Sequence, residues 1–205
     1  MKTNMSLKNI AMSALALVPL WAACDDGGSE NELEVFTTVS LTFTPVGGGA
    51  AVTAAFKDAD GDGGNAPTID PINLVAGTQY TTTVKFLNEL ETPVADITLE
   101  VKDEGDQHQV FLTGTAVNGP ASNQPTAPLT HTYSDTDVNG LPIGLSNNIA
   151  AKAGTGMLTL TLRHMPPVNG AAVKVAGLAD MVKASGLVAI GGETDVSVNF
   201  VVTVP

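Results

Sequence analysis

The sequence predicts a mainly β protein, an antiparallel immunoglobulin-like β-sandwich of about seven strands with one or two short helices. Threonine and valine dominate long stretches, and both residue types favour strands. Apolar and polar residues alternate in many segments, as they do where one face of a strand is buried. The 21 glycines and 12 prolines supply the turns. We expect one domain over residues 33–205.

A β-hairpin is expected at the start of this domain. Apolar or β-branched residues alternate with other types, first at Val35, Thr37, Val39, Leu41 and Phe43, and then at Ala50, Val52, Ala54 and Phe56. The segment Pro45–Gly49 between them has the composition of a turn. The period of two and the turn together predict two antiparallel strands.

Five further segments are rich in β-branched residues and are expected to form strands. They are 78–86, 110–115, 129–133, 156–163 and 194–204. The last shows the clearest alternation. Residues 118–128 hold three prolines without any periodicity and are expected to form a loop.

Two segments are predicted to be helical. Thr92–Pro93 resembles a helix start, and Val94, Ile97 and Val101 then follow at helical spacing. Ile97, Leu99 and Val101 also fit a strand, so both interpretations stay open there. Residues 178–184 are expected to form two helical turns that end at Ser185–Gly186.

The N-terminus has the three-part order of a secretory signal. A basic segment is followed by an apolar run of about a dozen residues, Ile10–Trp21, which is too short to span a membrane. Ala22, Ala23 and Cys24, the only cysteine, then match the end of a lipoprotein signal, although Trp21 stands where leucine is usual. We therefore predict a signal peptide at 1–23 and lipid attachment at Cys24. The alternative is an ordinary signal, but Trp21 or Leu20 would then occupy a position that prefers small residues.

Residues 24–32 are acidic and contain glycine, which is typical of a flexible tether. Acids directly after the cysteine resemble surface-export signals of Bacteroidota lipoproteins. In enterobacteria, an aspartate there resembles a signal for retention at the inner membrane. We expect a lipid-anchored protein of the cell envelope, at the periplasmic or surface face of the outer membrane.

The formal net charge of −12 disfavours nucleic acid as a partner, because phosphates repel an acidic chain. No G-x-S-x-G motif, second cysteine or nucleophile close to a histidine is present in the sequence. We therefore expect no enzyme. An envelope hydrolase, as the alternative, would need a cleft lined by paired carboxylates.

An aspartate-rich pattern occurs twice, each time after a predicted strand. Its side chains are Asp58, Asp60 and Asp62 in the first copy, and Asp135, Asp137 and Asn139 in the second. Alternating carboxylates on a turn are ligands for calcium. Ile69 and Ser146 stand where a full calcium loop carries its bidentate acid, so two polar hairpin turns are the alternative.

The three histidines, His108, His131 and His164, lie far apart in the sequence. If the strands that carry them converge, the three histidines would bind zinc, copper or iron. None forms a metal-ligand spacing with another, so three separate histidines are the alternative.

An ordered set of short segments resembles a group of small β-rich lipoproteins of the Bacteroidota type. The segments are Phe56–Pro67, Asn88–Glu89 with Pro93, Asp96–Thr98, His108–Phe111, Asp135–Gly140, Leu162–His164 and Gly191–Asp195. The resemblance covers nearly all of the mature chain and implies no established activity and no catalytic residues.

These observations predict a lipid-anchored, non-enzymatic binding or accessory module. Its expected partners are the membrane, through the lipid, and an outer-membrane receptor or another envelope protein. The alternative function is metal binding in support of an outer-membrane transporter, with calcium in the aspartate loops or a transition metal on the histidines.

Overall fold

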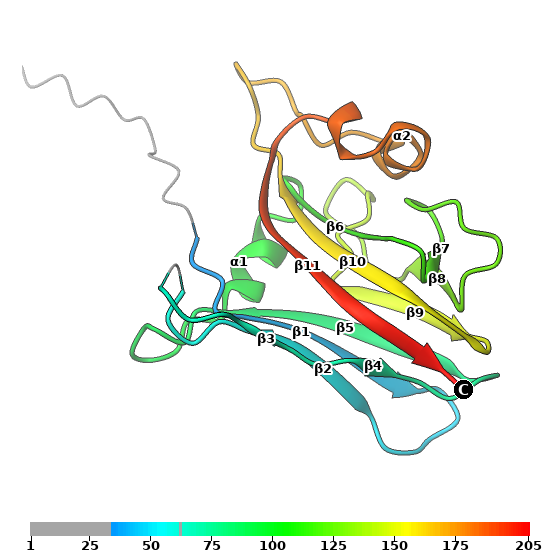
Figure 1. Cartoon of the computed structure of the whole chain (residues 1–205). Coiled ribbons are helices and arrows are strands. Elements are labelled where there is room, and N and C mark those ends of the chain that lie inside the picture. Colours follow the sequence, from blue (N-terminus) through cyan, green and yellow to red (C-terminus); the bar gives the residue numbers. More distant parts are fainter. Residues whose placement is uncertain (1–33, 62) are drawn as a thin grey trace, which may run out of the picture. The chain divides into compact units, whose positions relative to one another are not determined.

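Two β-sheets form the body of the protein (Figure 1), and the computed structural model describes them within residues 34–61 and 63–205. The predicted signal peptide 1–23, the lipid attachment site Cys24, the tether 24–32 and Asp62 lie outside the described residues. All described residues belong to one compact unit, Leu33–Pro205. The expectation of a mainly β protein is confirmed.

The larger sheet has seven strands in the order β3-β2-β1-β5-β9-β8-β7. These are β1 (Thr38–Pro45), β2 (Val52–Lys57), β3 (Thr68–Ile69), β5 (Gln79–Leu87), β7 (Val117–Asn118), β8 (Leu129–Tyr133) and β9 (Ser146–Ala151). β1 and β2 pair antiparallel as the predicted hairpin, with Val39 opposite Phe56.

The smaller sheet has four strands in the order β4-β11-β10-β6. Its members are β4 (Ile72–Asn73), β6 (His108–Thr113), β10 (Gly154–His164) and β11 (Glu193–Val204). The long strands β10 and β11 pair antiparallel over their whole length, and β6 pairs with the second half of β10.

The prediction of purely antiparallel pairing is wrong for two short pairs. β4 runs parallel to β11, and β7 runs parallel to β8, so both sheets are mixed. The prediction of about seven strands was low, because the described residues form eleven. Three of the missed strands have two residues each, and the fourth, β9, has the weakly β-forming sequence SNNIAA.

The inner faces of both sheets share one hydrophobic core. β1 contributes Val39, Leu41 and Phe43, β10 contributes alternate leucines, and β11 contributes Val198, Phe200 and Val202. All of these β1 side chains are fully buried. The alternation seen in the sequence therefore marks the buried face, as the two-residue period of a strand requires.

The helices are α1 (Ile97–Asp103), α2 (Leu178–Ser185) and the short 3-10 helix η1 (Leu187–Ala189). The helical interpretation around Ile97 is confirmed, but α1 begins after Asp96 rather than at Thr92–Pro93. α2 packs with Phe111 and Met165 in a second, smaller cluster. No helix within the described residues has the length and apolar character needed to cross a membrane.

Candidate metal centre

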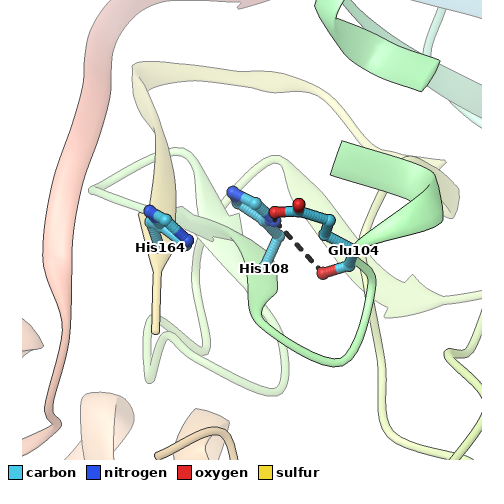
Figure 2. A group of neighbouring side chains, drawn as sticks. All are labelled: Glu104, His108 and His164. Atoms are coloured by element: carbon cyan, nitrogen blue, oxygen red, sulfur yellow. Dashed lines mark hydrogen bonds and ion pairs between the residues drawn. The ribbon is translucent and has the colours of Figure 1, made fainter. Parts of the chain in front are cut away.

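His108 and His164 lie side by side at one end of the smaller sheet. His108 is the first residue of β6, His164 is the last residue of β10, and the register of the two strands pairs them directly. Their rings stack with centroids 4.4 Å apart and an angle of 7° between the ring planes (Figure 2). His108 is buried and His164 is partly exposed, so the pair reaches from the interior to the surface.

Glu104, which caps the C-terminus of α1, fixes the orientation of the His108 ring. Nδ1 of His108 lies 3.1 Å from the backbone carbonyl oxygen of Glu104 (Figure 2). A carbonyl only accepts hydrogen bonds, so Nδ1 is the donor and Nε2 of the neutral ring carries the free electron pair. Burial, together with the nearby His164 and Lys174, lowers the pKa of His108 to about 4, so the ring is neutral at pH 7.

Glu104, His108 and His164 form a group with the donor chemistry of a metal site. Each offers one ligand atom, and these atoms all lie within 4.8 Å of one another. Two atoms bound to the same ion at about 2 Å are separated by at most about 4 Å. The Glu104 carboxylate lies 4.0 Å from Nδ1 of His108. Glu104 and His164, both partly exposed, would therefore have to rearrange toward the Nε2 side of His108 before all three residues could bind one ion.

Two further carboxylates lie at this end of the sheet. Oδ2 of Asp195 in β11 is 4.0 Å from Nε2 of His108. This atom and Oε2 of Glu34 are both buried without a hydrogen-bond partner among the described residues. Burial raises the pKa of Asp195 to about 6. Burial, followed by the charges of Glu100 and Asp195, raises the pKa of Glu34 to about 7. Negative charge is therefore concentrated here, and a cation would stabilise it.

The first aspartate loop is held partly by its own hydrogen bonds. Oδ2 of Asp60 accepts from the side-chain amide of Asn65 at 2.7 Å and from its backbone N–H at 3.3 Å. Oδ1 of Asp58 and Oδ1 of Asp60 have no hydrogen-bond partner among the described residues. Asp62 lies outside those residues, so calcium in this loop stays a prediction.

The carboxylates of the second aspartate loop are already engaged by protein donors. Asp135 accepts from the backbone N–H groups of Gly144, Leu145 and Ser146, and Asp137 accepts from those of Asn139 and Leu141. The ammonium group of Lys174 donates to Oδ2 of Asp137 at 2.8 Å. The Asn139 side chain is exposed. The geometry favours a structural role, with Lys174 supplying the positive charge that calcium would otherwise bring.

His131 is not part of the histidine pair. It lies in β8 of the larger sheet, where its Nε2 is 2.8 Å from Oδ1 of Asn147 and its ring contacts the edge of Tyr133. Two of the three predicted histidines therefore converge.

The sequence alone did not identify Glu104 and Asp195 as ligands. Glu104 stands four residues before His108, and the turn between α1 and β6 brings the two together, whereas nothing in the sequence links Asp195 to this site.

Comparison with known proteins does not assign the chain to a family. No protein-family model matches the chain, and neither the curated proteins nor the solved structures include a significant match. The functional argument therefore depends on the geometry of the site itself.

Proposed function

We propose that this protein is a non-enzymatic, lipid-anchored lipoprotein of the cell envelope whose folded domain binds a divalent transition-metal ion through Glu104, His108 and His164. The observation that carries the proposal is the convergence of their three ligand atoms within 4.8 Å. Imidazole nitrogens together with a carboxylate are ligands typical of zinc, and the set contains no thiolate.

The surroundings of His108 support metal binding rather than a purely structural stack. Metal-ligating histidines usually donate their second ring nitrogen to a carbonyl or carboxylate, which fixes the tautomer. The Glu104 carbonyl is in that position, 3.1 Å from Nδ1. The depressed pKa of His108 keeps the ring neutral, which is the form that binds a metal without first releasing a proton.

Ligation requires the histidine rings to leave their stacked arrangement. A bound metal lies in the plane of each imidazole, and two nearly parallel planes with centroids 4.4 Å apart do not share such a point. His164 is the ring that would tilt, because it is partly exposed whereas His108 is buried.

The proposal extends to the location and architecture of the protein. Cys24 carries the lipid, so the domain faces the periplasm or the cell surface as an accessory to an outer-membrane transporter or receptor. The two sheets sharing one core support a sandwich of the immunoglobulin-like type. The 21 acidic residues against 9 basic ones attract cations to such a surface.

Isothermal titration calorimetry with zinc tests the function. The full chain is purified in detergent, treated with a chelator and titrated with zinc and, separately, with calcium. We expect zinc binding that His108→Ala weakens by more than about 100-fold, since even the loss of an outer-shell partner costs 10- to 100-fold. The control is His131→Gln, which keeps a hydrogen-bonding group beside Asn147 and should bind as the wild type does.

The same titrations show how the proposal would fail. A folded wild-type chain that gives neither binding heat nor a melting shift with zinc would refute it. Calcium binding that Asp60→Asn removes and His108→Ala leaves intact would move the metal site to the first aspartate loop.

A further inference from the structure

A β-bulge interrupts the pairing of β10 with β11 beside the histidines. Leu162 pairs with Val196, whereas the next residue, Arg163, pairs with Thr194. Asp195 is left as the extra residue of β11. Bulges of this kind bend a strand and redirect one side chain, and they are frequent next to functional sites.

The bulge turns the Asp195 side chain away from solvent. Only 14% of it is exposed, whereas the neighbouring Thr194 and the following Ser197 are exposed residues. Its Oδ2 atom faces Nε2 of His108 at 4.0 Å. An acid withdrawn from water costs free energy unless a partner compensates its charge, so this position requires an explanation.

Neither of the facing atoms has a proton to offer the other. Nδ1 of His108 donates to the Glu104 carbonyl, which leaves Nε2 of the neutral ring as an electron-pair donor. Oδ2 of the ionised Asp195 is likewise a donor of electron pairs, and it has no hydrogen-bond partner among the described residues. The side chain of His108 is only 2% exposed. Two such atoms do not hydrogen-bond to each other directly, and a cation between them would stabilise both.

Arg163 makes no hydrogen bond to the Asp195 carboxylate, although its positive charge lowers the pKa of that group. Its guanidinium group donates to the carbonyl oxygens of Gly191 and Gly192 and to the hydroxyl of Thr194. These bonds hold the start of β11 against the end of β10 and stabilise the bulge. The hydrogen bonds of Arg163 are thus directed to the strand around Asp195 and not to its carboxylate.

We infer that Asp195 is a fourth ligand of the proposed metal site and binds the ion on the Nε2 side of His108. A distance of 4.0 Å is spanned by one ion with two bonds of about 2 Å. This inference rests on the proposed function and makes it more specific. Two histidines and two carboxylates neutralise a divalent ion and form a closed set for zinc, whereas soft copper(I) prefers sulfur ligands.

The test replaces Asp195 with asparagine, which keeps the shape of the side chain and removes its charge. The matched control is Asp103→Asn, which removes the same charge from an exposed residue next to Glu104. Zinc affinity is measured by calorimetry on the full chain in detergent, and cobalt(II) is used as a spectroscopic probe of the ligand field. We expect Asp195→Asn to weaken zinc binding at least tenfold and to alter the visible cobalt spectrum, and Asp103→Asn to change neither.

The possible outcomes distinguish a failure of the Asp195 inference from a failure of the proposed function. A wild-type chain that does not bind zinc would refute the proposed function. Zinc binding that is lost in His108→Ala but unchanged in Asp195→Asn, with an identical cobalt spectrum, would refute only the role of Asp195. Folding is checked by thermal melting in chelator, where Asp195→Asn should melt at or above the wild-type temperature because it removes a buried, unpaired carboxylate.

Discussion

At the scale of single residues, three groups with strongly shifted pKa values lie together at one end of the smaller sheet. The pKa values of Glu34 and Asp195 are raised to about 7 and about 6, and that of His108 is lowered to about 4. Burial is the first cause in all three cases. Burial that disfavours the charged forms of acids and bases side by side is typical of functional sites rather than of ordinary surfaces.

Glu34 gives a prediction for the metal-free protein. The pKa of Glu34 rises from its ordinary value of 4.5 to about 7 on folding. Between pH 4.5 and pH 7, the folded state therefore keeps a proton on Glu34 that the unfolded state has already released. Stability must then fall as the pH rises from 4.5 to 7. Glu34→Gln removes this contribution. We expect the variant to gain melting temperature relative to wild type above about pH 7 and to show little difference below about pH 4.5.

His108 contributes with the opposite sign. Its pKa falls from 6.5 to about 4 on folding, so its contribution to stability grows as the pH rises through that window. The comparison is therefore made as the difference between wild type and Glu34→Gln, in which the histidine contribution cancels. A melting-temperature difference that is independent of pH would contradict the raised pKa of Glu34.

At the scale of elements, the buried Lys174 connects three segments around the site. Its ammonium group donates to the Gly105 carbonyl at 2.6 Å and to Asp137 at 2.8 Å. The side chains of Lys174 and Asp137 are 0% and 1% exposed. Gly105 directly follows Glu104, so this ion pair joins the end of α1 to the loop 134–145 between β8 and β9 and to the segment before α2.

Breaking this pair should therefore be costly. Lys174→Met leaves the Asp137 carboxylate without its counter-charge, and removing one partner of a buried pair typically costs about 3–5 kcal/mol. We expect a loss of this size in the free energy of unfolding, measured by urea denaturation. The double variant with Asp137→Asn should recover part of it, because the buried charge is then removed as well.

Lys152→Met is the matched control, since Lys152 is exposed and its ammonium group contacts only the Pro125 carbonyl at 3.3 Å. It should stay within about 0.5 kcal/mol of wild type. An equal, small effect of both lysine substitutions would show that the Lys174 pair does not contribute to stability.

The elements also show what the sequence could predict. β5 alternates along its length, β11 alternates from Val196 onward, and α2 has apolar residues spaced four apart and a glycine at its end, so local patterns sufficed for all three. β9 has no such local pattern, and its pairing with β5 and β8 places it in the sheet. Tertiary pairing overrides weak local preference, which a single sequence does not display.

The same reason limits the prediction of the site. Pairing of β6 with β10 brings His108 next to His164, and a bulge in a third strand turns Asp195 toward them. Histidine was the correct residue type to single out, but the partners of each histidine depend on strand register. His131, with the same side chain, instead pairs with Asn147 in the other sheet.

At the scale of the whole molecule, the proposed lipid anchor and the proposed metal site are chemically independent. Cys24 is the only cysteine, so lipid on its sulfur leaves the folded domain without a thiol. The domain then offers nitrogen and oxygen ligands and the thioethers of its methionines, and the set at His108 consists of nitrogen and oxygen atoms. Single substitutions should therefore change the membrane location of the protein without changing its zinc binding, and the reverse.

Cys24→Ser tests this separation. The serine hydroxyl does not accept the lipid, so the variant should leave the membrane fraction and appear in soluble form, because two or three acyl chains hold a protein far more strongly than a short polar tether does. The released protein should bind zinc as the wild type does. His108→Ala is the reciprocal control, since it should stay with the membrane after a high-salt wash and lose zinc binding. Cys24→Ser protein that sediments with washed membranes would contradict the lipid anchor, and released protein that no longer binds zinc would show that anchor and site are coupled.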